Sequence, residues 1–200
     1  MVITLAVTLL LLAAFLGTND AVSGFFDSIG SRLSLPSGSR NIDFTLTADN
    51  FSDMSFNAKN PVNLTIDGAT NATLKSGNLQ TNSTLSVYGF RGTGSITGTT
   101  ISLDGKISKV ELPEIAVAVQ ETITSNSIFT GLSAVAIEMK TIKLHATGSI
   151  TVRNSTIQYS GDVEITDPAG DLEINRNNHV FYMTGKASKI TIPGSGVSIG

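Results

Sequence analysis

The sequence predicts an all-β domain behind an apolar N-terminal helix, and three observations support this. Hydrophobic and polar residues alternate with a period of two over most of residues 41–200, the pattern of strands with one buried face. Gly, Asn, Asp and Pro residues, which favour turns, separate the alternating runs. The first nineteen residues carry no charged side chain, which is typical of a segment that enters a membrane.

The N-terminal apolar run extends from Val2 to Leu16, and its polar groups are the hydroxyls of Thr4 and Thr8. In a helix these hydroxyls can bond to carbonyl groups one turn earlier. A spanning helix needs roughly 17 to 25 residues, so we expect residues 1–19 to form a transmembrane anchor whose last residues lie in the interface. A cleavable signal peptide is the alternative, because Ala21-Val-Ser23 offers small residues at a cut site, although no Lys or Arg precedes the run.

A second helix is predicted over residues 20–34, and a linker rich in Pro, Gly and Ser over residues 35–40. The apolar residues that share one face of this helix are Val22, Phe25, Phe26, Ile29 and Leu33. The amphipathic pattern indicates a juxtamembrane helix that lies in the headgroup region or packs on the following domain.

The period changes to two after the linker, and about fourteen short strands are expected. Ile42, Phe44 and Leu46 begin the first run, and similar runs continue to the C-terminus. One face of each strand is aliphatic and the other carries Thr, Ser, Asn and Lys. This predicts an antiparallel sheet folded over itself, a β-sandwich or flattened β-jellyroll. We expect strands to end at four prolines, namely Pro61, Pro113, Pro168 and Pro193.

Composition favours a location outside the cytoplasm. The chain has no cysteine, 47 Ser or Thr residues and only 14% charged residues. Five Asn-x-Ser/Thr sequons, the acceptor pattern for N-glycans, occur at Asn50, Asn63, Asn71, Asn82 and Asn154. Together with the anchor, these features predict a single-pass cell-membrane protein with an extracytoplasmic β domain at residues 41–200.

A weak internal repeat is present, since Thr93-Gly-Ser-Ile-Thr97 recurs as Thr147-Gly-Ser-Ile-Thr151. We interpret it as duplicated hairpins, with chance similarity in a Thr/Ser/Gly-rich chain as the alternative. Glycines also interrupt several strand patterns, which predicts bends, bulges or close backbone approach there. These glycines are Gly68, Gly105, Gly161 and Gly185.

Two resemblances follow from these residues. The segment from Gly92 to Ile107 resembles the Gly-x-Ile rhythm of bactofilins, which are cytoskeletal β-solenoids that polymerise. The whole plan, a short anchor before many strands with Gly corners, is similar to the anchored β-jellyroll proteins of lipopolysaccharide transport, and that similarity implies a trough for acyl chains. No diagnostic motif of either family is matched, so neither family is assigned.

Residues able to support catalysis are few, and we expect no catalytic, cofactor-binding or metal-binding site. His145 and His179 are the only side chains that ordinarily titrate near neutral pH, and both lie in strand-like contexts. Gly196-Val-Ser198-Ile-Gly200 matches the pattern of a nucleophile elbow but lacks the helix, acid and His that should follow. We therefore expect no enzyme activity.

Charged residues also suggest no ligand class strongly. The pairs Asp162/Glu164 and Asp171/Glu173, with Asp167 between them, could supply oxygen ligands to Ca²⁺, but a solvated acidic edge is the simpler interpretation. A net charge of −3 without a basic, aromatic patch excludes typical nucleic-acid binding. The lysines at 106, 109, 186 and 189 are interpreted as charges that protect edge strands.

These features predict a non-catalytic protein with a structural or binding role at the cell envelope. Its sheet edges or its Thr/Ser face would engage a protein partner, another copy or a glycan. The alternative is a carrier of an amphipathic lipid between the two layers. A carrier leaves part of its aliphatic interior unfilled, whereas a scaffold packs it closed.

Overall fold

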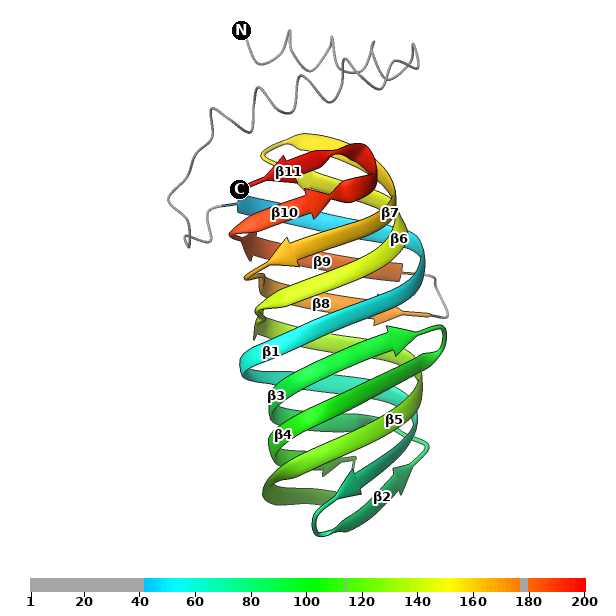
Figure 1. Ribbon diagram of the computed structural model, residues 1–200. Helices are drawn as coiled ribbons and strands as arrows, with labels where there is room; N and C mark the ends of the chain where they lie inside the picture. The colour runs from blue at the N-terminus through cyan, green and yellow to red at the C-terminus, as the bar shows by residue number, and fades with distance from the viewer. Residues whose placement is uncertain (1–41, 114, 177–179) are drawn as a thin grey trace, which may run out of the picture.

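The computed structural model describes residues 42–113, 115–176 and 180–200 (Figure 1). The predicted anchor, juxtamembrane helix and linker, and His179, lie outside the described residues. The described ranges contain no helix with the length and apolar character of a membrane span. The elements are β1 (Ile42–Leu74), β2 (Gly77–Thr81), β3 (Leu85–Thr97), β4 (Thr100–Leu112), β5 (Ile115–Glu138), β6 (Thr141–Val152), β7 (Ser155–Thr166), β8 (Ala169–Asn175), β9 (Val180–Ala187), β10 (Lys189–Ile192), the 3-10 turn η1 (Pro193–Ser195) and β11 (Val197–Ile199).

All eleven strands belong to one antiparallel sheet, which coils on itself into two layers (Figure 1). Strand β1 runs through the whole coil and changes partners along its length. It pairs with β6 and β9 at its start, with β3 in the middle, and with β5 and β2 at its end. Strand β5 likewise pairs first with β4, then with β1, and finally with β8. The all-β prediction is confirmed, and both layers are parts of one sheet.

The strands are fewer and longer than the alternating pattern suggests. Strand β1 has 33 residues and β5 has 24. Pro61, expected at a strand end, lies inside β1 at a register shift between Ala58 and Val62. A residue without an N–H is tolerated where the ladder is already irregular. The other three prolines follow strand ends as predicted: Pro113, Pro168 and Pro193.

The inner faces of the two layers form a single hydrophobic core. Its largest fully buried side chains include Phe90, Phe129 and Phe181. The Phe90 ring meets Phe56 edge-on, with 6.3 Å between ring centroids. Burial of such aromatic rings is worth several kcal/mol each, which holds the two layers together without any disulfide.

Two glycine pairs let neighbouring strands approach closely. Gly92 on β3 lies opposite Gly105 on β4, and Gly170 on β8 lies opposite Gly185 on β9. A Cβ atom at Gly105 would lie 2.3 Å from the carbonyl oxygen of Arg91, and one at Gly185 would lie 2.0 Å from that of Ala169. Only glycine fits such a position, so the predicted close backbone approach is confirmed at Gly105 and Gly185.

Candidate binding trough

Strand register aligns the polar residues of the outer face into continuous ladders. Directly opposite residues on antiparallel strands point to the same side of the sheet. Two adjacent ladders cross β2, β1, β5, β4, β3, β1 again and β6, and the first continues to β7. The first ladder is Gln80, Asn71, Asn126, Ser102, Ser95, Ser55, Lys143 and Glu164. The second is Asn78, Thr73, Thr124, Asp104, Thr93, Asn57 and Thr141.

Between the two ladders lies a hollow of about 980 Å³, which we call the polar trough. The floor is formed by five buried residues, Ala72, Ser125, Leu103, Gly94 and Phe56, and by the partly buried Leu79. Strand β1 contributes twice, through Ser55 and Asn71, because it returns to the same layer sixteen residues later. Seven inter-strand spacings of about 4.8 Å give the trough a length of roughly 34 Å. Strands β7, β6, β1, β3 and β4 of this layer follow one another in Figure 1.

Most of the residues that line the trough are uncharged and polar. Twelve of its fifteen ladder residues carry a hydroxyl or a carboxamide, and the other three are Lys143, Glu164 and Asp104. Lys143 and Glu164 form an ion pair at 3.5 Å. Hydroxyl and carboxamide groups both donate and accept hydrogen bonds. The trough therefore suits a long, neutral, hydroxyl-rich ligand, and its single lysine would hold a polyphosphate chain poorly.

His145 lies beside the trough and is exposed on β6. Its Nδ1 atom is 2.6 Å from Oδ1 of Asp162 on β7. Asp53 lies opposite it on β1. His145 is thus a surface residue, and its partner Asp162 lies on the neighbouring strand of the β6–β7 hairpin. No group of three potential metal ligands occurs in the described part of the chain.

The remaining candidate residues do not come together into one site. Ser198 is exposed within the short strand β11, and a nucleophile elbow would place it between a strand and a helix. The two acidic pairs lie on strands of different layers, β7 and β8 (Figure 1). Asp171 accepts a hydrogen bond from the backbone N–H of Ala136 at 2.8 Å. Ala136 lies at a register shift in β5, so Asp171 stabilises the backbone there.

The interpretation of the four lysines as edge protection is wrong for three of them. Lys106 and Lys109 lie on β4, which pairs with β3 on one side and β5 on the other. Lys186 lies on β9, between β8 and β1, and its Nζ atom is 3.7 Å from Oδ1 of Asp43. Sequence alone cannot distinguish an inner strand from an edge strand when both carry a polar outer face.

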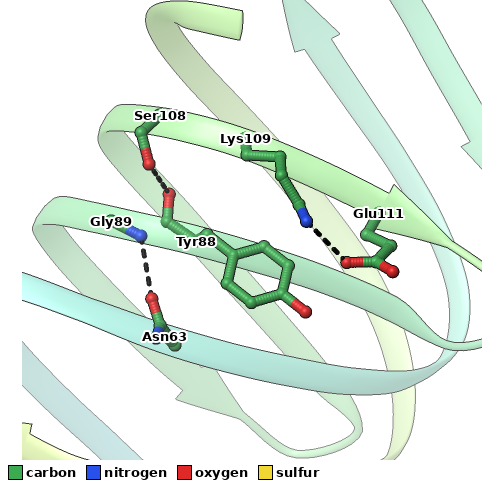
Figure 2. A network of polar contacts seen from close by, with 6 residues as sticks. All are labelled: Asn63, Tyr88, Gly89, Ser108, Lys109 and Glu111. Atoms are coloured by element: carbon green, nitrogen blue, oxygen red, sulfur yellow. Dashed lines mark hydrogen bonds and ion pairs between the residues drawn. The ribbon is translucent and has the colours of Figure 1, made fainter. Parts of the chain in front are cut away.

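A polar cluster on β3 and β4, away from the trough, was not predicted (Figure 2). The Nζ atom of Lys109 is 2.9 Å from Oε2 of Glu111 and 4.4 Å from the centre of the Tyr88 ring. Hydrogen bonding to Lys109 and Tyr88, with the lysine charge, lowers the pKa of Glu111, and the bond to Glu111 raises the pKa of Lys109. The sequence pattern that could have predicted this cluster is the two-residue spacing of Lys109 and Glu111, which places both side chains on one face of a strand.

The same figure shows how side chains hold the backbone in this region. The Oδ1 atom of Asn63 accepts a hydrogen bond from the N–H of Gly89 at 3.0 Å, and the hydroxyl of Ser108 donates to the carbonyl of Tyr88 at 2.9 Å (Figure 2). The ladder pairings skip Gly89 in β3 and Ser108 in β4. These bonds satisfy backbone groups where the ladder is irregular, so we assign the cluster a structural role.

Comparisons with protein-family models, curated proteins and solved structures found no match. Function is therefore argued from this chain's own residues.

Proposed function

We propose that this chain is a membrane-anchored, extracytoplasmic and non-catalytic binding protein, and that its polar trough holds an extended neutral glycan. The trough carries the proposal, because it presents a line of hydroxyl and carboxamide groups roughly 34 Å long. Donors and acceptors placed at the strand spacing can bond successive sugar units, each of which offers both kinds of group. The role fits the scaffold, since rigid strands hold the ladder in register.

The proposed location has three supports. The apolar run at residues 2–16 provides an anchor, and the absence of cysteine is compatible with an oxidising compartment. The asparagines of all five sequons occupy exposed positions, so an oligosaccharide could be attached to each: Asn50, Asn63, Asn71, Asn82 and Asn154. Asn71 lines the trough, and a glycan attached there would itself enter it.

Lipid carriage is the alternative that the interior argues against. A carrier between the two layers needs unfilled space among aliphatic side chains. The core side chains around the trough floor, such as Phe56 and Leu103, are 3% exposed or less. The trough and the smaller hollow near Lys75 and Glu121 are both lined mainly by polar residues.

The binding proposal is tested with two matched double variants. Full-length protein from a host that does not add N-glycans is titrated with labelled neutral linear hexasaccharides and with an oligouronate. Asn71→Ala with Asn126→Ala removes two opposed carboxamides from the trough. Each lost hydrogen bond is worth about 0.5–1.5 kcal/mol, so we expect about tenfold weaker binding of the neutral sugar.

The control is Ser86→Ala with Ser133→Ala, since both serines lie opposite Thr65, outside the trough. It should bind like the unchanged protein. Failure to bind any neutral glycan, or unchanged binding by the trough variant, would overturn the proposal. Native mass spectrometry that reveals a protomer with lipid-sized extra mass would favour the carrier.

The anchor has its own test. Full-length protein should stay in the membrane fraction after alkaline carbonate extraction, whereas residues 36–200 should be soluble. Release of a chain that begins near Gly24 would support a cleaved signal peptide instead.

A further inference from the structure

The first part of β5 has an edge that no described strand covers. Residues 115–128 pair with β4 on one side, but pairing with β1 on the other side begins only at Ile123. Near the end of the free stretch, Ser76 donates two hydrogen bonds to the carboxylate of Glu121, through its N–H at 2.8 Å and its hydroxyl at 2.6 Å. On this side, residues 115–120 therefore present backbone groups that no strand of the described ranges pairs with, which is a template for strand addition.

The sequence of this edge lacks the residues that usually prevent strand addition. Its sequence, Ile-Ala-Val-Ala-Val-Gln, has no charge, no proline and no glycine. Val117 on the inner side is 45% exposed, and Ala116 and Ala118 on the outer side are small and exposed. Natural edges are usually protected by charges, bulges or short length. This edge has a register shift against β4 between Ala118 and Glu121, but it carries no charge, and residues 115–118 pair regularly with β4. The lysines of β4 and β9 do not guard this edge, because those strands are paired on both sides.

The other free edges differ in ways that make them poorer templates. Strand β2 has five residues and β11 has three. The outer edge of β7 before its pairing with β10 is mostly polar, from Ser155 to Ser160. The start of β5 thus combines a free ladder, an aliphatic sequence and a partly exposed apolar side chain.

We propose that a second copy of this chain pairs with this edge, so that residues 115–120 of two β5 strands form an antiparallel, two-fold symmetric ladder. An uncharged edge meets its own copy without like-charge repulsion, and a two-fold interface closes on itself. Directly opposite residues must share a face. The symmetry axis therefore passes by Val117 or Ala118, which gives an overlap of five residues within this stretch, and pairing covers the exposed valine.

The absence of cysteine allows a direct test by crosslinking. Full-length Val117→Cys and Ala118→Cys variants in mild detergent are oxidised gently and analysed without reductant. At least one of them should convert largely to a disulfide-linked dimer, because residues facing each other across a two-fold axis have Cβ atoms about 4.5–5.5 Å apart. The control is Thr156→Cys, an exposed position on the free edge of β7, which should give no disulfide-linked dimer.

The unmodified chain gives the second measurement. Sedimentation equilibrium at micromolar concentration should show a dimer, and Ala118→Lys should raise its dissociation constant at least about tenfold, since two cations then meet at the interface. Thr156→Lys should leave the dimer unchanged. A monomeric unmodified chain, larger open oligomers, or equal crosslinking of Thr156→Cys would overturn the proposal. None of these results bears on glycan binding, because the trough residues lie outside the edge.

Discussion

The inner and outer faces of the same strands obey different rules. On β3, Phe90 and Ile96 are fully buried, whereas Thr93 and Ser95, which lie between them in the sequence, are exposed and line the trough. Packing between the layers restricts the size and shape of the inner side chains, so a change of one methylene group alters stability there. Most outer side chains are not constrained by this packing. Stability and binding can therefore be altered separately, by mutations on alternate residues.

Three hydroxyl residues break this division. Thr70, Ser125 and Ser127 lie on the inner face with hydroxyls that are buried and without a hydrogen-bond partner. Thr70 is directly opposite Ser127, and Ser125 follows on the same face of β5. A buried hydroxyl without a partner destabilises a protein, so the β1–β5 pair is the weak part of the core.

The largest effect is expected from truncation of the core. Phe90→Ala removes a fully buried ring and should lower the free energy of unfolding by about 3–5 kcal/mol. Ser95→Ala, on the outer face of the same strand, should change it by less than about 0.5 kcal/mol. Urea unfolding of both variants in the same detergent measures the difference. Equal effects would mean that the inner face does not determine stability.

A smaller loss is expected at the close approach of β3 and β4. Gly105→Ala places a Cβ atom 2.3 Å from the carbonyl oxygen of Arg91, so the two strands must move apart. We expect a loss of about 1–3 kcal/mol in the free energy of unfolding. Gly194→Ala is the control, because the nearest atom to its new Cβ is 3.8 Å away. If both variants unfold alike, close backbone approach is not why glycine occupies position 105.

The faces were predictable from sequence, and the ladders were not. Alternation along one strand shows which side is buried, because burial acts on each residue locally. The trough depends on register across many strand passes, and it brings together Ser55 and Asn71 through pairings that no local pattern reveals. Pro61 signals a strand end locally, yet in β1 it lies at a register shift inside a continuing strand. The bulge predicted at Gly68, by contrast, is present as a register shift between Asp67 and Gly68. The pairing of His145 with Asp162 is equally non-local.

The inner hydroxyls lead to an expected gain in stability. Ser127→Ala and Thr70→Val each remove a buried polar group that has no partner, and each should raise the free energy of unfolding by about 1 kcal/mol. Thr124→Val on the outer face is the control and should have little effect. A loss of stability in both inner variants would instead indicate a bound water held by these hydroxyls. Thermal or urea unfolding distinguishes the two results.

The smallest effect is expected on the outer face, at the cluster of Tyr88, Lys109 and Glu111. The pKa of Glu111 lies below its ordinary value, mainly because its carboxylate accepts a hydrogen bond from Lys109 and also bonds Tyr88. Protonation therefore favours the unfolded chain, in which the pKa is ordinary. Any stabilisation is present at neutral pH. It is lost as the pH falls below the ordinary pKa of glutamate and then through the lowered pKa of Glu111 in the folded chain.

Because the side chains of Lys109 and Glu111 are 39% and 40% exposed and their ion pair is screened by solvent, we expect this change to be visible in the titration and not in the unfolding free energy. A carboxyl NMR titration should place the Glu111 midpoint below that of an unperturbed glutamate, and Lys109→Met should move it upward. The same variant should unfold at the same urea concentration as the unchanged protein. Equal midpoints in the two proteins would show that the ion pair does not persist in solution. A clear loss of stability would show that outer-face contacts contribute to the fold, and the separation of the two faces would then fail at this point.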